Sequence, residues 1–115
     1  MGGIQIFRHQ EFGAIRTMSN EQGEPMFCAK DVAEALGYKL PRKAVQDHVD
    51  KGDVLKWNTP TVSGIQNMVY VNESGLYALI LSSKPENAIR FRKWVTSEVL
   101  PCIRKMHRSV SQSVN

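Results

Sequence analysis

The chain lacks the features that several classes of protein require. It has two cysteines among 115 residues, Cys28 and Cys102, which form no CxxC pair, and its three histidines show no ligand spacing with them. A disulfide-rich scaffold and a zinc site are therefore not indicated, and we expect buried thiols. No run approaches about 20 apolar residues, and the N-terminus has no signal-peptide pattern. We expect a cytoplasmic protein without a membrane partner.

Motifs of the common enzyme classes are missing as well. The sequence contains no GxxxxGK[ST], HExxH or GxSxG pattern. Asp31 and Glu34 are spaced as neighbours on a helix, but such acid pairs occur on most solvated helices. We expect a protein that is not an enzyme and that needs no metal or other cofactor.

Basic residues are in excess over acidic ones. The chain has 15 Lys and Arg against 11 Asp and Glu, which gives a formal charge of +4 and a pI near 9.3. This balance favours a polyanionic partner without establishing one. The length is that of one domain, which we place at residues 1–108, followed by a polar tail at 109–115 that should fray.

The first two thirds of the chain switch between strand and helix patterns. Alternating residues predict strands at 4–7, 11–18 and 25–28, and again at 54–57 and 67–71. Residues 58–66, with Pro60 and Gly64, predict a long, mobile hairpin tip. Helical spacing marks Ala29, Val32, Ala33 and Leu36, and then an inner face after Pro41 made of Ala44, Val45, His48 and Val49.

The last third predicts helices with clear boundaries. Asn72 is positioned to cap a helix at 73–81, and Ser83 and Glu86 have the spacing of a capping box around Pro85. Apolar residues at steps of four continue this helix until Pro101, which should interrupt it before a last helix with Cys102, Ile103 and Met106. The predicted fold class is α+β: a small antiparallel sheet with short helices and C-terminal helices packed on the core.

Residues 29–49 have the proportions of a helix-turn-helix with glycine at the bend. The second helix exposes Arg42 and Lys43 near its N-terminus and Gln46 one turn later, where a recognition helix meets base edges. Lys39 and Lys51 flank it, and the following hairpin would lie beside it like a wing. The alternative is that these are ordinary solvated side chains.

A second basic set lies on the C-terminal helices. At 100° per residue, basic side chains project opposite the apolar stripe if Pro101 only kinks the rod. They are Arg90, Lys93, Arg104 and Arg108, with Lys105 adjacent. This set is either a stripe that contacts phosphates or an ordinary polar face.

Two runs, ESGLY at 73–77 and WVTSEVLPCIRK at 94–105, closely resemble the N-terminal domain of the BRO family. That domain occurs in prophage antirepressors and in baculovirus repeated-ORF proteins, and the resemblance covers residues 4–108. It implies a DNA-binding regulatory module of phage or viral origin that acts inside the host cell. In prophages such modules head longer proteins.

The main hypothesis is therefore a domain that binds double-stranded DNA and controls phage gene expression. The residues assigned to DNA are Lys39, Arg42, Lys43, Gln46, Lys51, Arg90, Lys93, Arg104 and Lys105. Six phosphate contacts among them would give a log–log salt slope of about −5. The rival is a protein-interaction module that binds a phage repressor protein or forms a homodimer, through the hairpin tip and the last helix, without touching DNA.

Overall fold

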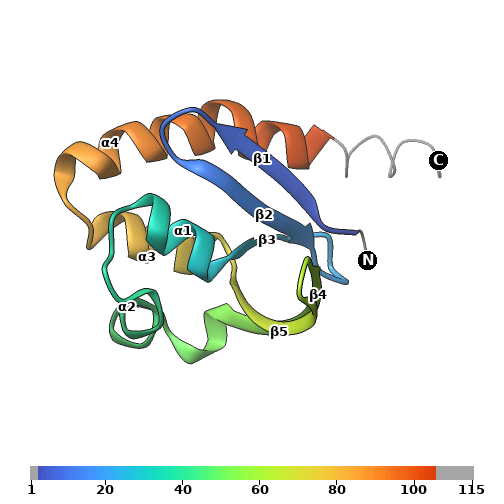
Figure 1. Cartoon of the computed structure of the whole chain (residues 1–115). Helices are drawn as coiled ribbons and strands as arrows, with labels where there is room; N and C mark the ends of the chain where they lie inside the picture. Colours follow the sequence, from blue (N-terminus) through green and yellow to red (C-terminus); the bar gives the residue numbers. More distant parts are fainter. Residues whose placement is uncertain (1–2, 106–115) are drawn as a thin grey trace.

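The computed structural model describes residues 3–105, in which a five-stranded sheet packs against helices (Figure 1). The strands are β1 (Gln5–His9), β2 (Gly13–Ser19), β3 (Pro25–Cys28), β4 (Val54–Thr61) and β5 (Gly64–Val71). The α-helices are α1 (Ala29–Ala35), α2 (Pro41–His48), α3 (Glu73–Leu81) and α4 (Pro85–Trp94). A 3₁₀ turn, Lys51–Asp53, joins α2 to β4, and a π-helical segment, Val95–Val99, follows α4. The predicted α+β class is confirmed.

The sheet is antiparallel throughout, with the strand order β1-β2-β3-β5-β4. Its two faces have separate apolar clusters, because neighbouring residues of a strand point to opposite sides. Phe27 and Val71, paired across β3 and β5, belong to the main core with the helices. Cys28 and Tyr70, the next pair, belong to a smaller cluster on the other face. The sheet thus lies between a helical layer and a small second cluster.

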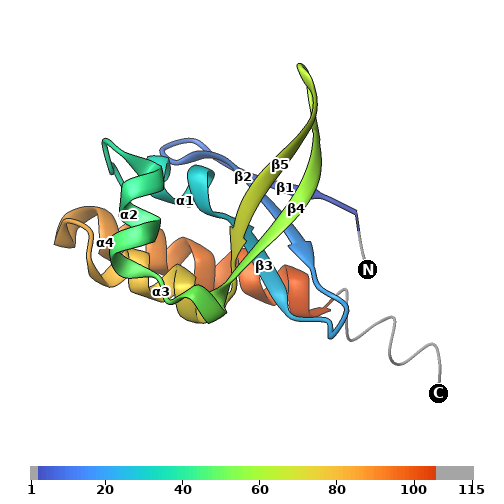
Figure 2. The ribbon, with the colours of Figure 1, turned by 90° about the horizontal axis from the view of Figure 1, so that it is seen from below.

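The β4–β5 hairpin is longer and more regular than the sequence predicted. Its strands pair from Val54 opposite Val71 up to Thr61 opposite Gly64, so only two residues form the turn. The predicted long tip at 58–66 is therefore wrong. Pro60 is tolerated within β4 because this strand is at the edge of the sheet, where a missing N–H breaks no ladder bond. Figure 2 shows the hairpin projecting far beyond the rest of the fold.

Pro101 does not interrupt the C-terminal helix. Helical structure continues from Pro85 through Lys105, and we call residues 85–105 the long helix. Just before the proline the helix widens into its π segment, where the Leu100 N–H donates to the Val95 carbonyl five residues earlier. Proline lacks an N–H and collides with the carbonyl four residues back, so a local widening lets the helix continue.

The long helix buries the predicted apolar stripe. Phe91, Val95, Val99 and Ile103 are buried in the main core. Cys102, assigned to the same stripe, is half-buried, and Met106 and Arg108 lie outside the described residues. Within the described part, none of the helices is long and apolar enough to cross a membrane.

Helix boundaries confirm one predicted cap and correct another. The Asn72 side chain accepts a hydrogen bond from the Gly75 N–H at 2.9 Å, which caps α3 as predicted. The Ser83–Glu86 capping box is wrong: α4 starts after Lys84, and the Ser83 hydroxyl instead donates to the Ile80 carbonyl at 2.7 Å. His48, predicted on an inner face, is exposed.

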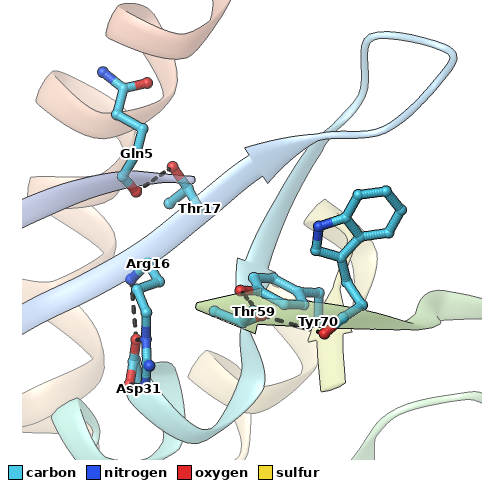
Figure 3. A network of polar contacts seen from close by, with 7 residues as sticks. Gln5, Arg16, Thr17, Asp31, Thr59 and Tyr70 are labelled. Atoms are coloured by element: carbon cyan, nitrogen blue, oxygen red, sulfur yellow. Dashed lines mark hydrogen bonds and ion pairs between the residues drawn. The ribbon is translucent and has the colours of Figure 1, made fainter. Parts of the chain in front are cut away.

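Polar contacts hold the strands in place around the sheet (Figure 3). The Arg16 backbone N–H and guanidinium donate to the Asp31 carboxylate at 2.8–3.0 Å, which joins β2 to the first turn of α1. Hydrogen bonding to Asp31 raises the pKa of Arg16. In the hairpin, the hydroxyl groups of Thr59 and Tyr70 lie 2.8 Å apart, and the Thr59 side chain is fully buried.

Both cysteines are free thiols within the described residues. Cys28 is buried as predicted, and its pKa is raised to about 11, chiefly because burial disfavours the thiolate.

Candidate nucleic-acid interface

The predicted pair of short helices is present as α1 and α2. Gly37, with φ of +88°, makes the bend after α1, a conformation that suits glycine. The Tyr38 hydroxyl then donates to the Leu79 carbonyl at 2.7 Å, and the Asn87 side-chain amide donates to the Leu36 carbonyl at 3.3 Å. These bonds tie the bend to α3 and α4, so α2 starts from a fixed position.

The N-terminus of α2 has no capping side chain within the described structure. Leu40 precedes the helix without a side-chain cap bond, and Pro41 is its first residue. The first helical hydrogen bond runs from the Ala44 N–H to the Leu40 carbonyl at 3.0 Å. By helix geometry the N–H groups of Arg42 and Lys43 have no intrahelical acceptor, and the helix dipole is positive at this end. Such a terminus attracts anions.

Basic side chains surround this same terminus. Lys39, Arg42 and Lys43 are all exposed, and residues 39–46 contain no acidic side chain. Gln46 is exposed one turn further along α2. Lys39, Arg42 and Lys43 thus lie together at the N-terminal end of α2, whereas Gln46 is in its last turn and Lys51 lies beyond it.

The C-terminal end of α2 is acidic by contrast. Asp47, Asp50 and Asp53 lie at or beyond its last turn, and Lys51 lies among them. Asp47 also forms an ion pair with Lys43, with 3.1 Å between the Lys43 Nζ and the Asp47 carboxylate, and both side chains are exposed. An exposed pair of this kind is weak and leaves Lys43 able to exchange partners.

The α2 terminus and the hairpin tip point to one side of the molecule. In Figure 1 α2 is seen nearly end-on, whereas in Figure 2 α2 and the hairpin are both seen from the side and extend upward in the picture. The bend before α2 and the hairpin tip lie at the top of Figure 2. We call this the projecting side of the molecule.

The second predicted basic set lies elsewhere. Arg90, Lys93, Arg104 and Lys105 are exposed on the long helix, which occupies the lower part of Figure 2, away from the hairpin tip. Two of them are already paired with acids. The Arg90 guanidinium donates to the Glu11 carboxylate at 2.8 Å, and this hydrogen bond raises the pKa of Arg90. Arg104 forms an ion pair with Glu73 at 3.0 Å.

The hairpin adds exposed residues that the sequence reasoning did not assign. Lys56, Asn58 and Pro60 alternate along β4, so they share one face of the hairpin. Asn67 lies on β5 opposite Asn58, and its side-chain amide donates to the side-chain oxygen Oδ1 of Asn58 at 3.0 Å. The alternation of side chains that begins at Val54 continues through Pro60 and could have predicted a longer strand. Pro60 was instead interpreted as part of a loop, because proline is rare inside strands.

Comparison with known proteins places the chain among relatives from bacteria and viruses. It is 47% identical over 91 residues to an uncharacterised protein of Haemophilus influenzae, covering 79% of this chain and 45% of that protein. It is 38% identical over 99 residues to a Bro-N domain-containing protein of Invertebrate iridescent virus 6, covering 70% of this chain and 24% of the relative. A Bro-N domain-containing protein of Autographa californica nuclear polyhedrosis virus is 27% identical over 117 residues, covering 85% and 36%.

The chain therefore spans less than half the length of each of these relatives. No solved structure matches it. The model of the BRO family N-terminal domain matches residues 14–101, a range that runs from β2 to the last turns of the long helix and includes α1, α2 and the hairpin. On this match, the chain belongs to the BRO family as an N-terminal domain.

Proposed function

We propose that this domain binds double-stranded DNA with its projecting side and thereby regulates phage or viral genes. The observation that carries the proposal is the uncapped N-terminus of α2, which combines unpaired backbone N–H groups, the positive end of a helix dipole and three exposed cations. A phosphate group satisfies all of these features at once.

Sequence readout is assigned to the same helix. Arg42 and Gln46 are one turn apart and therefore share a face of α2. Arg pairs with guanine and Gln with adenine through two hydrogen bonds each, and a good bidentate pair discriminates by about 1–3 kcal/mol. The basic residues Lys39 and Lys43, with Lys56 on the hairpin, would hold phosphates on either side, and Lys51 would reach the backbone only beyond the far end of α2.

The basic set of the long helix is assigned a secondary part. Arg90, Lys93, Arg104 and Lys105 would contact phosphates only of a duplex that bends around the molecule or of a second duplex. The primary site thus has three cations on phosphates, Lys39, Lys43 and Lys56, and the expected log–log salt slope is about −3.

The sequence offers a matched test, because the dipeptide Arg-Lys occurs both at 42–43 in α2 and at 92–93 in the long helix. The double variants R42E/K43E and R92E/K93E change the net charge equally. In fluorescence anisotropy on a labelled duplex at low salt, R42E/K43E should weaken binding at least 100-fold, because it places two acids at the phosphate site. R92E/K93E should weaken it less than tenfold, which is the general effect of net charge.

Equal losses in the two variants, or a larger loss in R92E/K93E, would contradict the proposed site. If the unaltered protein binds no duplex at low salt, DNA binding itself is wrong. A protein-interaction function then becomes the better account. The observation that favours this function is the exposure of two large apolar side chains near the start of the long helix, Leu81 by 81% and Ile89 by 69%. Sedimentation of the protein would test whether it self-associates.

A further inference from the structure

One face of the β4–β5 hairpin changes in chemistry from its base to its tip. Lys56 lies nearest the body, the amides of Asn58 and Asn67 follow as a cross-strand pair, and Pro60 with its partner Ile65 comes last. All five side chains are exposed, Ile65 by 74%. This face points toward the helical layer, because Val54, Val69 and Val71 on the same side of the two strands pack into the main core.

The opposite face of the hairpin is packed and stiff. Trp57 is part of the smaller cluster, and Thr59 is fully buried with its hydroxyl 2.8 Å from that of Tyr70. The hairpin is thus braced on one face, while the other carries the graded series of side chains and is turned toward the side of the helices. A preorganised ribbon loses little entropy on binding.

The hairpin differs from the rest of the projecting side in having almost no charge. Residues 57–72 contain no acidic or basic side chain. A polyanion therefore cannot be attracted to the tip by electrostatics, and an apolar, amide-lined ribbon matches the floor of a DNA groove better than its phosphate rim.

We propose that the hairpin enters the minor groove next to the major groove that receives α2, with Pro60 and Ile65 as an apolar wedge between base steps. The inference rests on the proposed function and deepens it. From Asn58 to Thr61 the strand spans about 10 Å, which exceeds the minor-groove depth of about 7.5 Å. Asn58 then lies at the rim of the groove, and the long side chain of Lys56 reaches the phosphates from above it.

The mechanics of base steps give the wedge a sequence preference. Pyrimidine–purine steps such as TA are flexible and kink readily when an apolar side chain is inserted. The wedge of Pro60 and Ile65 therefore favours TA-rich DNA.

The test compares two isoleucines of similar exposure, Ile65 at the tip and Ile89 on the long helix. Duplexes of about 30 base pairs with a central TA-rich or G·C-rich segment carry dyes at both ends, so that energy transfer reports bending. The unaltered protein and Ile89→Ser should bend the TA-rich duplex. Ile65→Ser should leave it straight and bind it about tenfold more weakly. The salt slope should be equal in all three, since no charge changes.

Equal bending by Ile65→Ser and the unaltered protein would overturn the wedge, as would salt-dependent binding by the unaltered protein without bending. Either result leaves the proposed function intact. Failure of the unaltered protein to bind any duplex overturns both. Because Ile65 is exposed, Ile65→Ser should keep the thermal midpoint of the unaltered protein, and this measurement separates lost contact from lost fold.

Discussion

Cys28 is a thiol held in its neutral form by its surroundings. It is the last residue of β3 and is fully buried in the smaller apolar cluster, and its pKa is raised from 9.0 to about 11. Desolvation is the main cause, and the nearby Asp31 carboxylate adds to it. The unfolded chain loses this proton near pH 9, whereas the folded protein holds it until about pH 11.

The free energy of unfolding should therefore fall as the pH rises from 9 to 11. The sign follows because the unfolded state releases the proton first in this window, and the thiol contributes about 2 kcal/mol. Tyr38 and Tyr70, whose pKa values are raised by burial, extend the decline to higher pH. Urea unfolding of Cys28→Ala across this pH range should show a decline smaller by about that amount. A decline unchanged in Cys28→Ala would refute this account.

Helix α3 meets β5 at a glycine with no space for a side chain. A Cβ atom on Gly75 would lie 2.9 Å from Val71 Cβ and 3.0 Å from Val49 Cγ1. Alanine is normally favoured over glycine inside a helix by about 1 kcal/mol. Here the collision outweighs that gain, because neither valine can move without disturbing β5 or the end of α2.

Gly75→Ala should therefore lower the free energy of unfolding by about 1–2 kcal/mol. Gly52→Ala is the matched control, since nothing lies within 4 Å of its added Cβ, and it should change stability by less than about 0.5 kcal/mol. Both are measured by urea denaturation. A Gly75→Ala protein as stable as the unaltered chain would mean that α3 can shift away from the sheet.

Elements fixed by local chemistry are the ones that the sequence predicts well. The helices at 29–35, 41–48 and 73–81 follow from apolar spacing, from Pro41 and from the Asn72 cap, all of which act within one helix. The length of the hairpin depends instead on pairing between β4 and β5 and on the contact of Thr59 with Tyr70, eleven residues away. The continuation through Pro101 depends on the π-helical widening at Val95–Val99, which no spacing rule indicates.

The candidate site was predictable in composition but not in arrangement. The cluster of Lys39, Arg42 and Lys43 is visible in the sequence because the three residues are close neighbours. That the long helix carries its cations on another side is a consequence of tertiary packing alone. The same holds for the alignment of α2 with the hairpin, which depends on how the bend at Gly37 is held against α3 and α4.

Positive charge is distributed over two sides of the whole molecule. The long helix and the preceding Lys84 have six basic and two acidic side chains, against three basic and no acidic ones at 39–46. Net charge alone would select the long helix as the interface. Exposed ion pairs occur on both sides, Lys43 with Asp47 at α2 and Arg90 with Glu11 and Arg104 with Glu73 on the long helix, so they do not decide between them. What distinguishes α2 is its N-terminus, which adds backbone N–H groups that no surface lysine provides.

The central claim is that duplex DNA is held by its phosphates at the N-terminus of α2, and the salt dependence of binding tests it most directly. Anisotropy between about 50 and 200 mM salt should give a log–log slope of about −3 for the unaltered protein. Lys39→Gln should reduce its magnitude by about 1, and Lys105→Gln, at the end of the long helix, should leave it unchanged. A slope near zero, or one that responds to Lys105→Gln and not to Lys39→Gln, would contradict the account.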